Sequence, residues 1–287
     1  MMSLSMRTRL IFMFSLLFGA GLVLLWGVFI VHQIWNVEIN WGIAKSCLVF
    51  IQEKSIAHDA TKVAADAFIF YTVNRMLLFA GKQWYQIRKW NREFHRQMDK
   101  GLTRKLNMKY RKLEIPFIVV NSNAFIALTI GLLRPKVVVS SWVFQNFSAQ
   151  EAEAILLHEA YHYRHRDPLK MFILSLCKVG FGFVPLFRIF FKHYQMGKEL
   201  LADQYAMDSM KSDFALSHVL LKLTKLHSRR ISQVGVPFAA EPSINYRIMQ
   251  VLEPGRGLGL PVISVSTIVI SLGIFILISS FLIGGCS

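Results

Sequence analysis

The sequence predicts an α-helical multipass membrane protein that carries a mainly α cytoplasmic domain with a small β-sheet. Three observations lead to this fold class. Hydrophobic residues make up 54% of the 287 positions, and the mean hydropathy is +0.41. Two long stretches carry no formal charge, and most of the excess positive charge lies in one block. A composition of this kind argues against an ordinary soluble domain.

The two uncharged stretches cover residues 10–35 and 261–287. Each is longer than the ~20 residues that a helix needs to cross the hydrocarbon core of a bilayer. Arg7 and Arg9 precede the first stretch, as in a signal peptide, but its apolar run is about twice the usual length and no cleavage pattern follows. We therefore predict an uncleaved N-terminal span within residues 1–36 and a C-terminal span at 261–285.

The positive charge is placed asymmetrically along the chain. Residues 82–112 contain 11 Lys and Arg against two acidic residues, whereas residues 32–63 contain three of each sign. The positive-inside rule places the basic block in the cytoplasm and a loop at 37–62 outside the membrane. A basic block beside a span meets anionic lipid more often than nucleic acid. The net charge of +16 therefore requires no direct nucleic-acid partner.

A chain that starts inside and is inside again after residue 82 must cross once more between these points. Only residues 63–81 can form this second span. They include Asp66, Asn74 and Arg75, which would have to be buried against protein or water. The cytoplasmic domain would then occupy residues 82–260.

Within this domain the sequence indicates strands first and a long helix after them. Residues 115–144 are rich in Val, Ile and Phe and are broken by turn residues, which predicts short strands at 116–120 and 136–140. Ser148 and Glu151 then form the sequence pattern of a capping box, which starts a helix. Pro168 helps to end that helix.

The stretch 171–191 is apolar and long enough to span a membrane. It nevertheless contains two cationic residues, with two glycines and Pro185 near its middle. These residues favour a broken, re-entrant hairpin whose two arms are each too short to cross. Residues 192–260 are mixed in charge and are expected to be mainly helical.

The predicted long helix carries the pattern His158-Glu159-x-x-His162. Residues four apart lie on one face of a helix about 6 Å apart, so the two imidazoles can bind one ion. Glu159 would lie beside the open coordination position, where it could accept a proton from water. The motif thus offers two zinc ligands and a general base, the core of a zinc hydrolase site. A third protein ligand must come from elsewhere in the chain.

Two candidate sources of the third ligand can be compared. His165 would lie about 10 Å further along the helix than His158, too far to share the ion. Glu199 and Asp203 are again four apart, so Glu199 could bind the metal while Asp203 accepts the second N–H of a ligand histidine. The alternative for this pair is a solvated helix face with Lys198. Because the upstream motif is present, we favour the ligand role, with one Zn²⁺ per chain.

These motifs resemble those of the BlaR/MecR-type antirepressor metallopeptidases, a membrane family of gluzincins. The similarity lies in HEAYHYRHRDPL, the hydrophobic break FGFVPLF and the downstream KELLADQYA, and it covers about residues 115–250. More distantly, the chain is similar to the HtpX and CAAX-protease group. The resemblance implies a gluzincin-like zinc peptidase domain with His158, His162 and Glu199 as ligands, Glu159 as general base and Asp203 as the orienting carboxylate.

The expected function is that of a membrane-bound zinc metalloendopeptidase acting at the cytoplasmic face of the plasma membrane. Its partners would be a protein or peptide substrate, with a cytoplasmic repressor as one candidate, together with membrane lipids and a second copy of the chain in a homodimer. An extended substrate is expected along an edge strand near residues 118–126. Because the sequence ends at Ser287, we expect this chain to lack the penicillin-binding sensor of the β-lactam receptors.

Two other functions remain open from the sequence. The chain could be a non-enzymatic signalling or scaffold protein with a structural zinc. It could also be a protease that removes damaged membrane proteins, with the same chemistry and no regulatory role.

Overall fold

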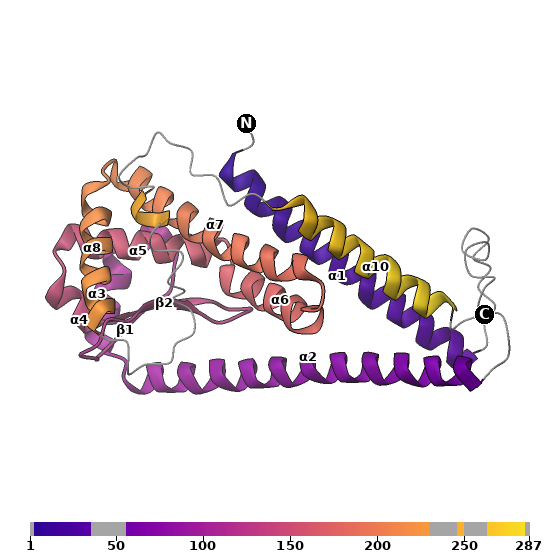
Figure 1. Cartoon of the computed structure of the whole chain (residues 1–287). Helices are drawn as coiled ribbons and strands as arrows, with labels where there is room; N and C mark the ends of the chain where they lie inside the picture. Colours follow the sequence, from indigo (N-terminus) through magenta and orange to yellow (C-terminus); the bar gives the residue numbers. More distant parts are fainter. Residues whose placement is uncertain (1–2, 36–55, 230–245, 250–262, 285–287) are drawn as a thin grey trace. The chain divides into compact units, whose positions relative to one another are not determined.

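The computed structural model of the chain describes residues 3–35, 56–229, 246–249 and 263–284 (Figure 1). These residues are mostly helical and include one small sheet. The helices are α1 (Leu4–Trp35), α2 (Ile56–Arg96), α3 (Lys100–Lys109), α4 (Ser141–Asn146), α5 (Ala149–Arg164), α6 (Asp167–Gly180), α7 (Pro185–Met210), α8 (Phe214–Arg229) and α10 (Val265–Gly284), with a short 3₁₀ turn at Arg111–Leu113. The strands are β1 (Phe117–Val120), β2 (Ala127–Ile130) and β3 (Lys136–Ser140).

The chain forms two compact units. Unit 1 contains Met1–Arg9, Gln83–Phe172 and Lys192–Pro261. Unit 2 contains Leu10–Lys82, Ile173–Phe191 and Val262–Ser287. The small sheet and the predicted metal-binding residues all belong to unit 1.

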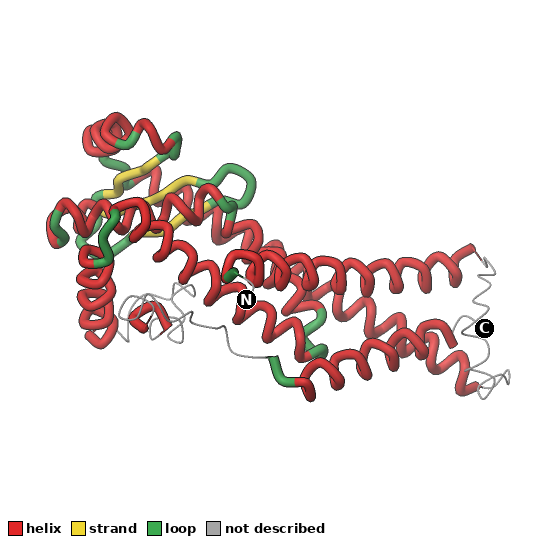
Figure 2. Tube along the Cα trace, turned by 90° about the horizontal axis from the view of Figure 1, so that it is seen from above, coloured by secondary structure: helices red, strands yellow, loops and turns green. Residues whose placement is uncertain are grey.

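The sheet of unit 1 has the order β1-β3-β2, with β1 parallel and β2 antiparallel to the central strand. Figure 2 shows its three strands in yellow among the helices. Alternate side chains point to opposite faces. Val137 and Val139 of β3 pack with Ile155 and Leu156 of α5, whereas Val138 packs in a second cluster on the other face. The strands predicted at 116–120 and 136–140 are confirmed to within one residue.

The two outer edges of this sheet differ. Beside β1, the backbone N–H of Phe117 donates to Asn107 Oδ1 at 3.0 Å and that of Val119 donates to Thr103 Oγ1 at 2.9 Å. The backbone N–H of Asp99 also donates to the Val119 carbonyl at 2.9 Å. Side chains of α3 and the backbone before it therefore close the edge of β1. No described strand pairs with the outer edge of β2.

The hydrogen-bond register shows which groups of β2 face outward. The N–H of Ser140 donates to the Ile126 carbonyl at 2.8 Å, and the N–H of Val137 donates toward β1. In an antiparallel pair, residues alternate between facing the partner strand and facing away from it. Leu128 therefore faces β3, while Ala127 and Thr129 direct their backbone N–H and C=O groups to the open edge.

A tight turn joins β2 to β3. It begins at Gly131, whose φ of +105° is a conformation that side chains rarely adopt. A Cβ at this position would lie 2.7 Å from the carbonyl oxygen of Arg134. Glycine is therefore required for the turn that places β2 against α5.

The helix that carries the HExxH motif begins as the sequence predicts. Ser148 Oγ accepts the N–H of Glu151 at 3.2 Å, and Glu151 Oε2 accepts the N–H of Ser148 at 2.7 Å, which completes the capping box. Lys222 of α8 donates to the same Glu151 carboxylate at 2.7 Å. At the other end, Arg166 has a φ of 50°, and this left-handed residue lets α6 begin at Asp167 directly after α5.

Residues 167–210 form a helical hairpin, and the stretch 171–191, for which a re-entrant hairpin is predicted, lies within it. Its helices α6 and α7 are separated by residues 181–184. Tyr194 of α7 contacts Asp167, the first residue of α6, so the chain returns to the place it left. The tip lies in unit 2, where Phe181 and Phe187 pack with Leu22 and Trp26 of α1. Ser271 of α10 accepts the N–H of Leu186 at 3.2 Å and so satisfies one free donor at the start of α7.

Among the described residues, two helices are long and apolar enough to cross a membrane, through the stretches Leu4–Val31 and Lys62–Arg96. A third apolar helix, α10, contains a shorter stretch, Val265–Ser279. The loop predicted at 37–62 lies mostly outside the described residues, and its last residues already belong to α2. With 41 residues, α2 extends for about 60 Å, so it continues well beyond the span predicted at 63–81.

Candidate metal centre

The two histidines of the HExxH motif lie one turn apart on α5, and both are buried. Their Nε2 atoms approach each other to 3.1 Å. Since one helical turn brings both side chains to the same face, the local sequence alone accounts for this convergence.

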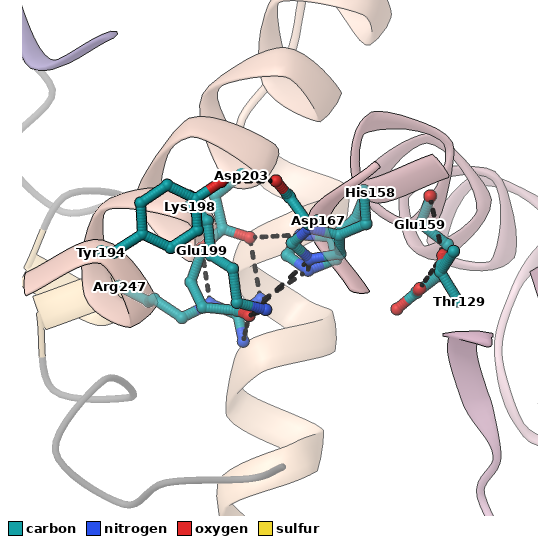
Figure 3. Close-up of polar contacts among 10 residues, drawn as sticks. Thr129, His158, Glu159, Asp167, Tyr194, Lys198, Glu199, Asp203 and Arg247 are labelled. Carbon is teal, nitrogen blue, oxygen red and sulfur yellow. Dashed lines mark hydrogen bonds and ion pairs between the residues drawn. The ribbon is translucent and has the colours of Figure 1, made fainter. Parts of the chain in front are cut away.

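The third predicted ligand comes from α7. Glu199 Oε2 lies 3.3 Å from Nε2 of His158, and Oε1 lies 3.7 Å from Nε2 of His162 (Figure 3). Ligands at zinc distances of 2.0–2.1 Å in a tetrahedron are separated by about 3.3 Å. The three side chains therefore present a triangle of donor atoms of the size that a zinc ion requires, and their nature, two imidazoles and a carboxylate, suits zinc as well.

Behind His158 lies the carboxylate predicted for this role. Asp203 Oδ1 is 2.8 Å from Nδ1 of His158, and the Asp203 side chain is fully buried. Arg247 binds the same carboxylate with two hydrogen bonds, Nε to Oδ2 at 2.6 Å and Nη2 to Oδ1 at 2.8 Å. Its Nη1 also lies 3.6 Å from Glu199. The carboxylate thus orients the imidazole, and the guanidinium fixes the carboxylate.

Behind His162 lies a second carboxylate, which the sequence did not assign to the site. Asp167 Oδ2 is 2.8 Å from Nδ1 of His162, and Tyr194 donates its hydroxyl to Asp167 Oδ1 at 3.0 Å. In the sequence, the position of Asp167 directly before Pro168 indicates a helix cap or a turn residue. It does begin α6, but its side chain also contacts His162, a predicted metal ligand.

The electrostatics of the cluster favour ionised carboxylates. Burial would raise the pKa of Glu199, but the charges of Lys198 and His162 hold this pKa well below its ordinary value. Lys198 donates to Glu199 Oε1 at 2.8 Å. Burial likewise opposes ionisation of Asp203, yet Arg247 and His158 lower its pKa. Both acids are therefore anionic at neutral pH.

The same carboxylates act on the imidazoles. Burial and Lys198 lower the pKa of His162, but Glu199 and Asp167 outweigh them and raise it to about 9. Burial also opposes the charged form of His158, and Asp203 and Glu199 raise its pKa. Before a metal binds, protons on the imidazoles balance the negative charge that a cation would otherwise balance.

A count of formal charges gives the same result. The carboxylates at the site belong to Glu159, Asp167, Glu199 and Asp203, and the cationic side chains are Lys198 and Arg247. With neutral imidazoles these groups leave a formal charge of −2, which one divalent cation would balance. The residues present therefore fit a zinc ion in charge, donor type and spacing.

The predicted general base lies on the side of α5 that faces the sheet. Thr129 of β2 donates its hydroxyl to Glu159 Oε2 at 2.9 Å and to the backbone carbonyl of Glu159 at 3.1 Å. Figure 3 shows this pair beside the histidine cluster. The charge of Glu159 also contributes to the raised pKa values of Lys198 and Arg247, which places this carboxylate within electrostatic reach of the ligand group.

The structure brings together His158, His162, Glu199 and Asp203. Glu159 follows His158 on α5, and its carboxylate contacts Thr129. His165 lies outside this group and stacks on Tyr161 at a centroid distance of 3.9 Å. For Arg247 the sequence is compatible with two roles, a contact with the carboxylates of the site or a surface position, and it assigns no role at the site to Thr129, Tyr194 or Lys198. Lys198 could have been found as the neighbour of a predicted ligand, whereas no spacing rule links Thr129 to Glu159, 30 residues away.

Two histidines on one helix and a glutamate on a second helix, beside a small sheet, form a candidate metal site of the kind expected in a metallopeptidase. The comparisons specify the family. The family model described as BlaR1 peptidase M56 matches residues 48–251, and the chain belongs to this family, as the resemblance predicted.

One curated relative is the Regulatory protein BlaR1 of Bacillus licheniformis. It is 30% identical to this chain over 122 residues, which cover 42% of this chain and 20% of the relative. The alignment therefore spans about a fifth of the length of that protein.

Proposed function

We propose that this chain is a membrane-bound zinc metalloendopeptidase that cleaves a protein substrate at the cytoplasmic face of the plasma membrane in antirepressor-type regulation. The observation that carries the proposal is the triangle of His158, His162 and Glu199 donor atoms, with an orienting carboxylate behind each histidine. Burying two carboxylates costs folding free energy. Such a cost is expected where both imidazoles must be held in a fixed orientation to bind a metal.

In this proposal His158, His162 and Glu199 hold one zinc ion. When bound, zinc would supply a Lewis acid that polarises a peptide carbonyl and lowers the pKa of water, so that the water is readily deprotonated to the nucleophile. Glu159 takes the proton from the attacking water and later passes it to the leaving amine. Asp203 and Asp167 keep the two imidazoles in the tautomer whose Nε2 lone pair faces the metal.

The substrate would bind as an added strand on β2. From the sequence we predicted an edge strand near residues 118–126. Within that range, the outer edge of β1 is filled by Asn107 and Thr103 of α3 and cannot accept another strand. The outer edge of β2 offers the backbone groups of Ala127 and Thr129 and lies beside Glu159. Replacing Ala127 by proline removes one outward N–H without breaking the β2–β3 ladder, so it should raise KM with little change in kcat.

The proposed topology follows the charge asymmetry of the sequence. The spans would be residues 10–35, 63–81 and 261–285, with residues 82–260 in the cytoplasm and the tip of the α6–α7 hairpin dipping into the membrane. The packing of that tip with α1, α2 and α10 in the apolar cluster of unit 2 supports this arrangement. The hairpin would enter and leave the membrane on the same side. This is necessary because Glu199, which lies after the tip, is close to His158, which lies before it.

Replacement of Glu159 by glutamine tests the catalytic role. The full chain in detergent is incubated with zinc and unfolded casein, and kinetics are then measured on a fluorogenic peptide built around a bond that is cleaved. The Glu159→Gln variant should keep its zinc and lose at least ~100-fold in kcat, while Glu153→Gln on the same helix should remain active. Full activity of Glu159→Gln would contradict the mechanism, and zinc without any cleavage by the wild type would favour a structural zinc.

The regulatory role needs a separate test. In cells, the Glu159→Gln variant should retain uncleaved substrate, which can be isolated with it and identified. Recovery of a soluble DNA-binding repressor would agree with the proposed role. Recovery of assorted misfolded membrane proteins alone would instead indicate quality-control proteolysis.

A further inference from the structure

Thr129 is the described residue of β2 whose side chain forms hydrogen bonds with the predicted general base. Its side chain points to α5, where the hydroxyl contacts Glu159. Its backbone N–H and C=O groups point in another direction, to the open edge of the sheet, as the register of β2 against β3 requires. The same residue therefore lies at the proposed substrate edge and at the base.

The hydroxyl of threonine has a single proton to donate. It is shared between the Oε2 atom and the backbone carbonyl of Glu159, at 2.9 Å and 3.1 Å. No hydrogen bond from a described residue reaches the other carboxylate oxygen, Oε1. The contact therefore fixes one oxygen of Glu159 and leaves the second available for a proton from water.

We propose that Thr129 is a positioning residue that holds the carboxylate of Glu159 toward a substrate strand docked on β2. This inference rests on the proposed function. A free glutamate side chain samples many rotamers, and general-base catalysis depends on the carboxylate lying within hydrogen-bond reach of the proton it takes. A threonine on a sheet is well suited to restrict it, since its β-branched side chain has few rotamers and its backbone is fixed by the β2–β3 ladder.

The arrangement also links substrate binding to the base. An added strand would form hydrogen bonds with the N–H and C=O of Thr129. Those bonds would hold the Thr129 backbone, and through the hydroxyl they would hold Glu159 at the distance set by the docked peptide. A purely structural role is the competing explanation, in which the hydroxyl only ties β2 to the carbonyl of α5.

The test compares Thr129→Val, which keeps the shape and removes the hydroxyl, with Thr129→Ser, which keeps the hydroxyl. The probe is the fluorogenic peptide identified with the wild-type chain. We expect Thr129→Val to lower kcat about tenfold, a part of the 10²–10⁴-fold that a positioned base contributes. KM should stay within about twofold because the backbone groups are unchanged, and Thr129→Ser should recover most of kcat.

Two measurements that do not depend on activity accompany the kinetics. Zinc content per chain should be equal in the wild type and both variants. The affinity of the zinc-free proteins for the labelled peptide, measured by fluorescence anisotropy, should also be equal. If Thr129→Val does not fold, Thr129→Ala against Thr129→Ser gives the same comparison.

The outcomes separate this inference from the proposed function. Wild-type cleavage that Thr129→Val leaves unchanged, with only a lower melting temperature, would overturn the positioning role and leave the peptidase proposal intact. A kcat loss that serine does not restore would also overturn it. Absence of cleavage by the zinc-loaded wild type would overturn the proposed function and this inference with it.

Discussion

The two histidines of the HExxH motif are supported in different ways. Behind His158, Asp203 is an ionised and fully buried carboxylate that Arg247 balances, and the three residues come from α5, α7 and the segment 246–249. Behind His162, Asp167 follows after only five residues, and its outer partner is the neutral phenol of Tyr194. The first support is a long-range ion pair and the second depends largely on the local turn. Loss of the first should therefore damage the fold, whereas loss of the second should mainly weaken metal binding.

Removal of Asp203 should have the largest effect. The Asp203→Ala variant leaves the Arg247 guanidinium in a buried place without its main partner, which costs ~3–5 kcal/mol of folding free energy. The melting temperature and zinc content of the purified chain should both fall, while Asp208→Ala, at an exposed position of the same helix, should change neither. A second variant that combines Asp203→Leu with Arg247→Met should recover stability without recovering zinc. Wild-type stability of Asp203→Ala alone would contradict the ion-pair account.

The protons held by both histidines predict a strong pH dependence of zinc binding. His162 has a pKa of about 9 before metal binds, and the pKa of His158 is also raised. Zinc must displace a proton from His162 below pH 9, so its affinity should rise with pH and level off above that value. From pH 8 to pH 6 the zinc affinity should fall at least ~100-fold. The protons released on zinc binding should be detectable by calorimetry in buffers of different ionisation enthalpy. A constant zinc affinity across this range would contradict the raised pKa values of the two histidines.

Replacement of Asp167 should weaken zinc binding and largely spare the fold. Asp167→Asn keeps the shape of the side chain and removes the charge that orients His162. We expect a 10–100-fold loss of zinc affinity in a chelator competition, with a smaller drop in melting temperature than Asp203→Ala produces. A larger loss of stability than that of Asp203→Ala would reverse the proposed difference between the two supports.

The smallest effect is expected from Tyr194. The Tyr194→Phe variant removes one hydrogen bond to Asp167 and leaves the aromatic ring in place. Zinc affinity should fall by roughly fivefold, in line with the ~1 kcal/mol that one hydrogen bond contributes. An effect equal to that of Asp167→Asn would show that the phenol, and not the carboxylate charge, determines the support of His162.

The comparison of the two supports also explains what the sequence could predict. His158, Glu159 and His162 follow from helical spacing after a capping box, and Glu199 with Asp203 follow from the same spacing on a second helix. Each of these pairs is a local relation along the chain. The parallel register of β1 with β3, the contact of Thr129 with Glu159 and the pairing of Arg247 with Asp203 join segments 20–44 residues apart. No sequence period encodes such contacts, because they depend on how the elements pack.

Asp167 is the instructive intermediate case. Its position before Pro168 is typical of a helix cap or a turn, but neither reveals where the second carboxylate oxygen points. The left-handed backbone of Arg166 turns α6 back toward α5 and brings Asp167 to His162. The chain thus changes direction at Arg166, and Asp167 both begins α6 and contacts His162.

The most direct test of the central claim is the zinc content of matched variants. Purified wild-type chain and Asp208→Asn should each bind one zinc per chain after loading and dialysis, and Glu199→Gln should retain much less. X-ray absorption at the zinc edge should show two imidazole nitrogens and oxygen ligands in the wild type. Full retention of zinc by Glu199→Gln with an unchanged spectrum would contradict a centre built from His158, His162 and Glu199.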